Sequence, residues 1–267
     1  RNTAAEPATN PARNEIMNSC SRQMPVSVTV KPVNRIRTLT FDLDDTLWDN
    51  REVIRAAEQA VHNWLDDHYP RVTARYSQED MRRMRLDLLR REPGLRNRIT
   101  DLRKQSLRLA ARNAGYDEDL VEPAFAVFIE ARHRISLYDD VTPALLRLRG
   151  AGYMLGSLTN GNADVNRLGI ARLFDFNLTA ESVGRAKPHP RLFEEACRLS
   201  GVSPLELAHV GDEAETDLAG GLAAGVNVIW MNRLEQPATP GIMPHAEVRD
   251  MGGLLAMLGL DNRQERT

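Results

Sequence analysis

The sequence predicts an α/β protein in which helices cover both faces of a parallel β-sheet, with an all-helical segment inserted after the first strand. Residues 36–43 form a β-branched and apolar run, which is typical of a buried strand. Residues 50–138 carry apolar side chains at helical spacing. From residue 139 onward, strand patterns alternate with helix patterns, and this alternation indicates parallel strands joined by helices.

The inserted segment is predicted to contain four helices, whose apolar faces lie at residues 53–65, 81–89, 95–114 and 124–131. Tyr69-Pro70 and Pro93-Gly94 are expected to end the first two helices, because proline cannot continue a helix. The many arginines of this segment are interspersed with acids. This mixture favours a solvated surface over a basic patch for an anionic substrate, but both interpretations stay open.

The segment 139–260 contains alternating elements, and residues 35–49 and 139–260 together make up the predicted core domain. Predicted helices lie at 143–149, 164–173, 191–199 and 216–224, and predicted strands lie at 153–159, 176–180, 207–210 and 226–231. In such sheets, ligands bind beyond the carboxyl ends of the strands. A functional site is therefore expected in the loops that follow the strands.

Composition and charge narrow the functional classes. The chain has 35 Lys and Arg against 37 Asp and Glu, and its formal net charge of -2 argues against a nucleic-acid-binding protein that works through bulk charge. The longest uncharged stretch, from Leu218 to Asn232, is too short to span a membrane. Cys20 and Cys197 are far apart and form neither a disulfide framework nor a zinc motif. This cysteine usage favours the reducing cytoplasm.

Both ends of the chain are predicted to be tails. Residues 1–34 are rich in Ala, Asn, Pro, Arg and Ser and lack the apolar core of a signal peptide, so we expect a disordered tail there. Because the first residue is Arg1, and Met17 or Met24 could be the true start, this stretch is interpreted as part of a fragment or of an over-extended reading frame. Residues 261–267 form the second predicted tail. The sequence leaves open whether the protein is a monomer or a homodimer.

Two aspartates follow the first predicted strand. Asp42 and Asp44 are two positions apart, and because side chains alternate along a strand they project to the same side. Carboxylates held together at the end of a buried strand repel each other and are costly to desolvate. A divalent cation or a shared proton is the usual compensation. An acidic turn without a function would have the same residues, so this stretch alone leaves both interpretations open.

Three further strand ends carry residues that suit the same chemistry. Thr159 is followed by Asn160 and Gly161, and the hydroxyl and backbone donors of this turn can reach a phosphate oxygen. Lys187 precedes a proline-marked helix start, where it can place a positive charge on an anion. Residues 211–217 follow another strand and offer the oxygen ligands that a hard cation prefers, although they could instead cap the next helix.

The ordered set of four strand ends resembles the motifs of the haloacid dehalogenase-like hydrolase superfamily, whose phosphatases share a Rossmann-like core. Residues 42–46 resemble the first motif, residues 159–161 the second, Lys187 the third and residues 211–217 the fourth. The resemblance covers about residues 35–258. It implies that the insertion at 50–138 is a helical cap that closes over the active site.

This resemblance implies a magnesium-dependent phosphoric monoester hydrolase. Asp42 would attack phosphorus and form an aspartyl-phosphate, and Asp44 would act first as general acid and then as general base. Mg²⁺ would be held by the Asp42 carboxylate, the Asp44 backbone carbonyl and Asp212.

The resemblance also assigns phosphate-binding and supporting residues. The expected phosphate-binding residues are Thr159, Asn160, Gly161 and Lys187, with backbone N–H groups near Leu43 and Gly161. Asp217 is expected to orient Lys187 or a metal-bound water. The other expected supporting residues are Leu43, Thr46 and Glu213. Glu213 departs from the family pattern, since many relatives have Asp at that position.

Residues 41–50, 158–163 and 209–212 further resemble the bacterial branch that dephosphorylates FMN and 5-amino-6-(5-phospho-D-ribitylamino)uracil, a riboflavin-pathway intermediate. The predicted partner is therefore a small-molecule phosphate ester. A phosphatase for another sugar or polyol phosphate, or a phosphomutase, would retain the same motifs. A haloalkanoate dehalogenase needs neither a metal nor an acid two residues after the nucleophile, so Asp44 and Asp212 count against it. A non-catalytic binding domain often loses a catalytic acid, and none is missing here.

Overall fold

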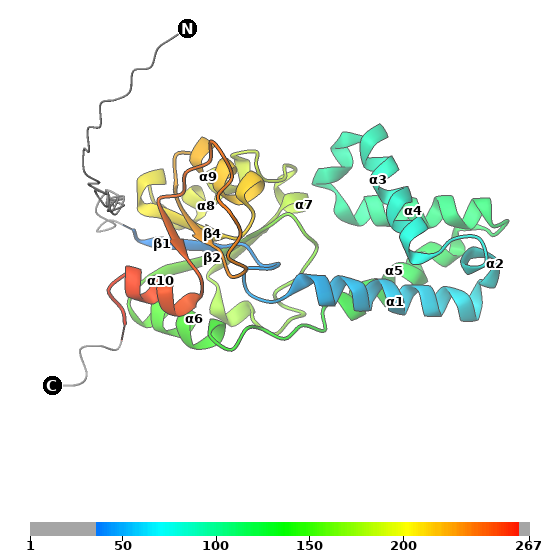
Figure 1. Ribbon diagram of the computed structural model, residues 1–267, viewed down its shortest axis with the longest axis horizontal. Helices are drawn as coiled ribbons and strands as arrows, with labels where there is room; N and C mark the ends of the chain where they lie inside the picture. Colours follow the sequence, from blue (N-terminus) through cyan, green and yellow to red (C-terminus); the bar gives the residue numbers. More distant parts are fainter. Residues whose placement is uncertain (1–35, 262–267) are drawn as a thin grey trace, which may run out of the picture. The chain divides into compact units, whose positions relative to one another are not determined.

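The computed structural model describes residues 36–261, and their core is a parallel β-sheet (Figure 1). The order across the sheet is β3-β2-β1-β4-β5-β6. The strands are β1 (Thr38–Phe41), β2 (Met154–Thr159), β3 (Phe176–Thr179), β4 (Leu207–Gly211), β5 (Asn227–Met231) and β6 (Ala246–Val248). Apart from Asp261, the predicted tails at 1–34 and 261–267 lie outside the described residues.

The register of the central strands brings three loops to one edge of the sheet. β1 lies between β2 and β4, and Phe41 pairs with Ser157 on one side and Val210 on the other. The Asp42 backbone N–H donates to the Val210 carbonyl at 2.9 Å and extends this pairing by one residue. Because the strands are parallel, the residues that follow β1, β2 and β4 leave the sheet side by side.

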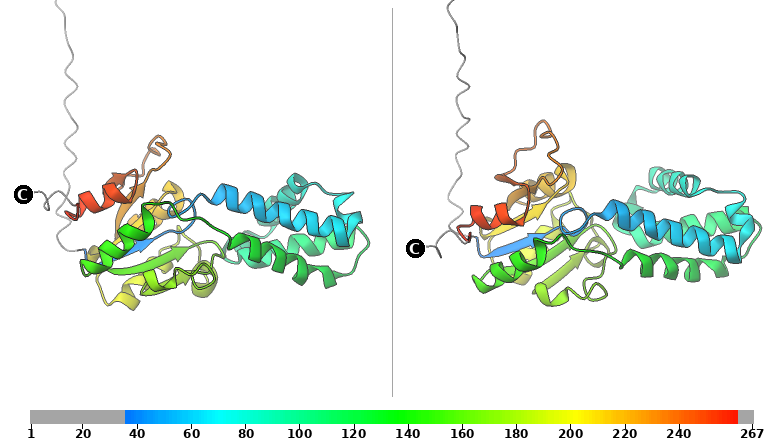
Figure 2. Two further views of the ribbon diagram at one scale, coloured as in Figure 1. Left: turned by 90° about the horizontal axis from the view of Figure 1, so that it is seen from below. Right: turned by 60° about the horizontal axis from the view of Figure 1, so that its bottom comes forward.

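Helices pack on both faces of the sheet (Figures 1 and 2). On one face, α6 (Val141–Gly150) and α10 (Met251–Met257) cover a buried cluster that includes Leu39 and Phe41. On the other face, α8 (Arg191–Ser200) and α9 (Ala219–Ala223) cover a cluster that includes Leu158 and Phe193. The predicted α/β class, a Rossmann-like parallel sheet with helices on both faces, is confirmed.

The segment between β1 and β2 is helical. Its helices are α1 (Asn50–His68), α2 (Pro70–Thr73), α3 (Gln78–Arg91), α4 (Ile99–Asn113) and α5 (Val121–Arg132), with 3-10 turns at Pro93–Asn97 and Glu118–Leu120. Helices α1 and α5 run side by side (Figure 2), and Leu65, Leu107 and Leu120 belong to an apolar cluster within this segment. Within residues 36–261, no helix has both the length and the apolar character needed to cross a bilayer.

Local sequence signals account for the ends of these helices. The Asp49 side chain accepts a hydrogen bond from the Arg51 backbone N–H at 3.0 Å and caps the start of α1. Ser77 and Asp80 form a capping box at the start of α3. Helix α8 ends at Gly201, whose φ of 65° is a left-handed conformation that glycine adopts without strain.

The predicted helix at residues 164–173 is wrong. The structure has turns there, followed by a 3-10 turn at Ala171–Leu173. The Asp164 side chain accepts a hydrogen bond from the Asn166 backbone N–H, which competes with helix formation, and Gly169 has a left-handed φ of 72°.

Other predicted elements differ in extent. Residues 216–224 do not form one regular helix, since a π-helical turn at Ala214–Leu218 precedes α9. The first strand is shorter than the predicted 36–43 and spans Thr38–Phe41. The sequence patterns also missed β6, α10 and the short helix α7 (Ala180–Val183).

Candidate active site

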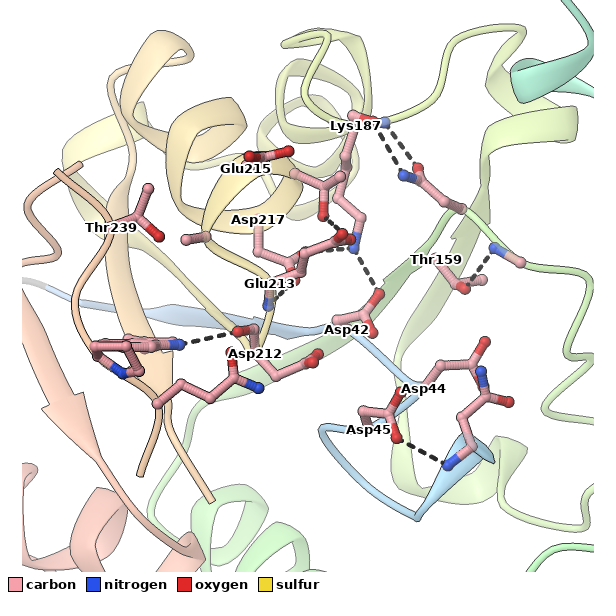
Figure 3. Close-up of a pocket in the computed structure, with 18 residues that line it drawn as sticks. Asp42, Asp44, Asp45, Thr159, Lys187, Asp212, Glu213, Glu215, Asp217 and Thr239 are labelled. Carbon is pink, nitrogen blue, oxygen red and sulfur yellow. Dashed lines mark hydrogen bonds and ion pairs between the residues drawn. The ribbon is translucent and has the colours of Figure 1, made fainter. Parts of the chain in front are cut away.

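The strand ends form the wall of a cavity of about 520 Å³ (Figure 3). Its lining includes members of all four sequence motifs, namely Asp42, Asp44, Thr159, Asn160, Gly161, Lys187, Asp212, Glu213 and Asp217. These residues come from loops that are far apart in the sequence and meet at the carboxyl edge of the sheet. The predicted site residues Leu43 and Thr46 lie behind the cavity wall, where both are buried.

Lys187 lies at the centre of the acidic residues (Figure 3). Its ammonium group donates to Asp42 Oδ1 at 2.6 Å, to Asp217 Oδ1 at 2.6 Å and to the Leu158 backbone carbonyl at 2.7 Å. These contacts use all three N–H donors of the ammonium group. The position of Lys187 Nζ is therefore fixed by three different segments of the chain.

The loop that carries Lys187 is held by Asn160. The Asn160 side-chain Oδ1 accepts from the Lys187 backbone N–H at 2.7 Å, and its Nδ2 donates to the Lys187 carbonyl at 3.0 Å. Asn160 was predicted to bind phosphate. In the structure its side chain spans the Lys187 peptide groups and connects the second motif to the third, and its phosphate-binding role stays a prediction.

Burial and charge shift the pKa values of this cluster. Desolvation raises the pKa of Asp42 well above its ordinary value, with Lys187 acting in the opposite direction. Burial is the largest single influence on Lys187 and Asp217 and opposes their ionised forms. For Lys187 the attraction and hydrogen bonds of Asp217 and Asp42 together outweigh it and raise the pKa. For Asp217 the attraction and hydrogen bonds of Lys187 and His209 together outweigh it and lower the pKa. His209, which lies in β4, contacts Asp217 Oδ1 through Nε2 at 3.1 Å and adds to the stabilisation of that carboxylate.

Asp212 follows β4 and faces Asp42. Its Oδ1 accepts a hydrogen bond from the Thr46 hydroxyl at 3.0 Å, and its backbone carbonyl accepts from the Trp230 indole N–H at 2.9 Å. Burial and the negative charge of Asp217 raise the pKa of Asp212 to about 7. Thr46 thus orients one acid of the fourth motif from the loop of the first motif.

The acidic residues suit a hard divalent cation. Carboxylate oxygens of Asp42, Asp212 and Asp217 lie within 4.8 Å of one another. Lys187 contacts two of these three acids, and burial, together with the negative charges of the neighbouring aspartates, raises the pKa values of Asp42 and Asp212. Oxygen ligands gathered around uncompensated negative charge are the environment that Mg²⁺ prefers. The side chain of Asp44 is directed away from this group, and the role predicted for Asp44 as a metal ligand concerns its backbone carbonyl.

Asp44 lies against the turn of the second motif. A Cβ atom at Gly161 would come within 2.9 Å of Asp44 Oδ2 and 3.3 Å of the Thr159 hydroxyl oxygen, so a larger residue there would have to displace the Asp44 carboxylate. The Gly161 backbone N–H donates to the Thr159 hydroxyl at 2.9 Å. Glu213 is exposed, and its carboxylate accepts from Thr216 Oγ1 at 2.8 Å.

Several residues at the site were missed by the sequence patterns. Trp230 in β5 and Gln236 and Thr239 in the loop after it line the cavity but belong to none of the four motifs. Arg132, the last residue of α5, contacts Asp44 across 88 positions of sequence. No spacing pattern in the sequence indicates that an arginine at a helix end contacts this carboxylate. The contact is defined only by the tertiary structure.

The parallel sheet, with carboxylates and a buried lysine at its carboxyl edge, defines an α/β enzyme. Residues 36–225 match the family described as haloacid dehalogenase-like hydrolase, and the chain belongs to this family. It is therefore a hydrolase, and its curated relatives support phosphatase activity.

Three relatives illustrate the range of similar proteins. The 5-amino-6-(5-phospho-D-ribitylamino)uracil phosphatase YigB of Escherichia coli (strain K12) is 31% identical over 236 residues, which are 85% of this chain and 98% of that protein. A structure titled 2-haloacid dehalogenase from Pseudomonas syringae pv. Tomato DC3000 has a TM-score of 0.78 and 38% identity, and the match covers 84% of this chain and 98% of that one. A HAD phosphatase from Thermococcus onnurineus shares the fold, with a TM-score of 0.62, 23% identity, and coverage of 85% of this chain and 99% of that chain.

Proposed function

We propose that this chain is a magnesium-dependent phosphomonoester hydrolase that acts through an aspartyl-phosphate on Asp42. The observation that carries the proposal is the contact of the Asp42 carboxylate with buried Lys187, in a cavity that also contains Asp44 and Asp212. A carboxylate is a competent nucleophile toward phosphorus when a nearby cation removes the repulsion between the two anions. Lys187 meets that requirement at 2.6 Å.

In the first half-reaction, a carboxylate oxygen of Asp42 forms a bond to phosphorus while the bond from phosphorus to the ester oxygen breaks. The carboxylic acid of Asp44 gives its proton to the departing alkoxide. In the second half-reaction, the Asp44 carboxylate takes a proton from water, and the water oxygen attacks the same phosphorus. The bond to Asp42 breaks, and inorganic phosphate is released.

Other residues of the chain stabilise the charge of the transferred group. Lys187 and the Thr159 hydroxyl are proposed to bind phosphoryl oxygens, together with backbone N–H groups near Leu43 and Gly161. Asp217 is proposed to orient Lys187, which is consistent with their contact of 2.6 Å. Asp42, Asp212 and the Asp44 backbone carbonyl are the proposed holders of Mg²⁺, which when bound would neutralise charge on the nucleophile and the phosphate.

The proposed substrates are FMN and 5-amino-6-(5-phospho-D-ribitylamino)uracil. Support comes from the sequence similarity of residues 41–50, 158–163 and 209–212 to that branch, and from the activity for which the Escherichia coli relative is named. The cavity volume of about 520 Å³ is in the range of small-molecule sites, roughly 300–1,000 Å³. A phosphatase for another sugar or polyol phosphate, or a phosphomutase, uses the same residues and is the main alternative.

Dehalogenation is a second candidate function, because the structure from Pseudomonas syringae with 38% identity is titled a dehalogenase. Displacement of a halide requires no proton for the leaving group. A dehalogenase therefore needs neither an acid two residues after the nucleophile nor the carboxylate of Asp212 beside Asp42. The presence of both acids in one cavity favours phosphoryl transfer.

The test is a comparison of kcat/KM for FMN, the ribitylamino-uracil phosphate, hexose phosphates, polyol phosphates and nucleotides at fixed Mg²⁺, with 2-chloropropionate as the dehalogenase substrate. We expect phosphate release from the first two compounds to be preferred. Preference for a hexose phosphate over FMN by about tenfold, or roughly 1.4 kcal/mol of differential transition-state binding, would contradict the substrate proposal alone. Chloride release without phosphatase activity would contradict the whole proposal, and isomerisation without phosphate release would favour a mutase.

A further inference from the structure

Arg132 brings the helical segment into contact with the proposed general acid. It is the last residue of α5, and its side chain is 1% exposed. Its Nη2 donates to both carboxylate oxygens of Asp44, at 2.5 and 2.8 Å. Asp44 lies in the loop after β1, so the contact forms when α5 lies against this loop. The position of the Asp44 carboxylate thus depends on a residue outside the four motifs.

The Asp44 carboxylate lies close to both Gly161 and Arg132. A Cβ atom at Gly161 would come within 2.9 Å of Asp44 Oδ2. The Nη2 of Arg132, which donates to this carboxylate, would lie 3.8 Å from the same Cβ atom. Arg132 therefore reaches the turn that also carries Thr159, and its two hydrogen bonds favour the observed rotamer of Asp44.

The end of α5 is itself fixed to the core. His133, the next residue, accepts a hydrogen bond from the Asp164 backbone N–H through Nε2 at 2.9 Å, and its Nδ1 pairs with the Ile129 carbonyl at 2.5 Å. The Arg132 guanidinium also lies 5.8 Å from the centre of the Trp48 ring. These contacts hold Arg132 in place independently of Asp44, as expected of a residue that positions a partner.

We propose that Arg132 is a positioning residue that holds the Asp44 carboxyl group in the orientation needed for proton transfer to the leaving oxygen. When the helical segment lies over the carboxyl ends of the strands, the Asp44 carboxyl group is therefore in position to donate its proton. This inference rests on the proposed function of Asp44. A general acid must be within hydrogen-bond reach of the leaving oxygen, and a misplacement of about 1 Å can reduce a rate by about 100-fold.

The experiment compares Arg132→Met on two esters. kcat/KM for an alkyl phosphate includes protonation of a poor leaving group, whereas p-nitrophenyl phosphate releases a phenolate that needs no proton. We expect kcat/KM to fall by about 10- to 100-fold for the alkyl phosphate and by less than about threefold for p-nitrophenyl phosphate. Arg132→Lys should recover part of the loss. The matched control is Arg134→Met, since Arg134 is 73% exposed and pairs with Glu130 on the surface of α5.

A double-mutant cycle with Asp44→Asn separates positioning from a structural role. If Arg132 acts through Asp44, adding Arg132→Met to Asp44→Asn should not lower kcat/KM for the alkyl phosphate any further. Equal losses on both esters, or additive losses in the cycle, would overturn the inference and leave Arg132 as a tie between α5 and the core. Unchanged alkyl-phosphate hydrolysis in folded Asp44→Asn would overturn the proposed function of Asp44, and this inference with it. Circular dichroism and Tm establish that each variant is folded.

Discussion

At the residue scale, the site depends on pairs of side chains that were predicted separately and that the fold brings into contact. Asp42 and Lys187 are 145 positions apart in the sequence and 2.6 Å apart in the structure. Asp217 shares the same ammonium group at 2.6 Å. Because the lysine compensates two buried carboxylates, the loss of any one of the three changes the charge balance of the others.

The catalytic pair gives the first prediction. Asp42→Asn should abolish turnover, because an amide is a poor nucleophile. Asp44→Asn should slow turnover by roughly 100- to 10,000-fold, the loss expected for a missing general acid or base. Steady-state kinetics on a phosphate ester, with circular dichroism to establish folding, measures both effects. Wild-type turnover by folded Asp42→Asn would rule out the aspartyl-phosphate mechanism.

Gly161 gives a second prediction at this scale. In Gly161→Ala the new methyl group must displace Asp44 Oδ2, which lies 2.9 Å away, or crowd the Thr159 hydroxyl at 3.3 Å. Since Asp44 can rotate aside, we expect a nearly unchanged Tm but a loss of kcat/KM of up to about 100-fold. Gly150→Ala is the control, because a Cβ atom there meets nothing within 4 Å. Full activity in Gly161→Ala would show that this placement of Asp44 is not needed.

At the element scale, the parallel register explains why the loops of β1, β2 and β4 share one site. Phe41, Ser157 and Val210 are neighbours across the sheet, so the acids that follow β1 and β4 face each other. The loop after β1 turns back at Asp45, whose φ of 58° is left-handed and whose Oδ1 accepts from the Asn50 backbone N–H at 3.0 Å. This turn directs the chain into α1 and keeps the acids at the edge of the sheet.

The contact between the loops of β1 and β4 gives the third prediction. Thr46→Val preserves the shape of the side chain but removes the hydroxyl that donates to Asp212 Oδ1 at 3.0 Å. A lost orienting contact of this kind typically weakens metal binding by about 10- to 100-fold. In a titration of activity with Mg²⁺, the variant should therefore need a higher Mg²⁺ concentration for half-maximal activity. Its kcat at saturating Mg²⁺ should change less. Thr73→Val, in the helical segment, is the control. An unchanged Mg²⁺ requirement in Thr46→Val would argue against Asp212 as a ligand.

At the scale of the whole molecule, the acidic cluster links metal binding to stability. The pKa of Asp212 is raised to about 7, so between about pH 4 and 7 the folded protein holds a proton that the unfolded chain has released. In the absence of metal, the stabilising contribution of Asp212 is thus present at low pH and is lost as the pH rises toward 7. A metal ion bound to the ionised carboxylate replaces that proton.

The fourth prediction follows from this linkage. Chelation with EDTA should abolish activity, and Mg²⁺ should raise Tm more at pH 8 than at pH 6, because protons compete with the metal below about pH 7. At 100 times its dissociation constant, a ligand adds about 2.7 kcal/mol to stability. Asp212→Ala should lose both the Mg²⁺-induced rise in Tm and its pH dependence. Full turnover of a phosphate ester in excess EDTA would reject the role of the metal.

The sequence by itself determined the fold class and most of the elements. Alternating strand and helix patterns were sufficient, because a strand or helix that buries one face has apolar residues at a regular spacing along the sequence. The same logic predicted the loop residues Asp42, Thr159, Lys187 and Asp212, since parallel strands place their following loops at one edge, although α7 lies between β3 and Lys187. It failed at residues 164–173, where the apolar spacing suits a helix but the Asp164 side chain and Gly169 favour turns.

Only the tertiary structure decided how these residues act on one another. It placed the Asn160 side chain on the Lys187 backbone, connected Thr46 to Asp212, and brought Arg132 from α5 to Asp44. Contacts of this kind produce no periodic residue pattern in the sequence, because they depend on the packing of segments that are tens to hundreds of residues apart. Their geometry is set by strand register, loop direction and the docking of α5, and these become defined when the chain has folded.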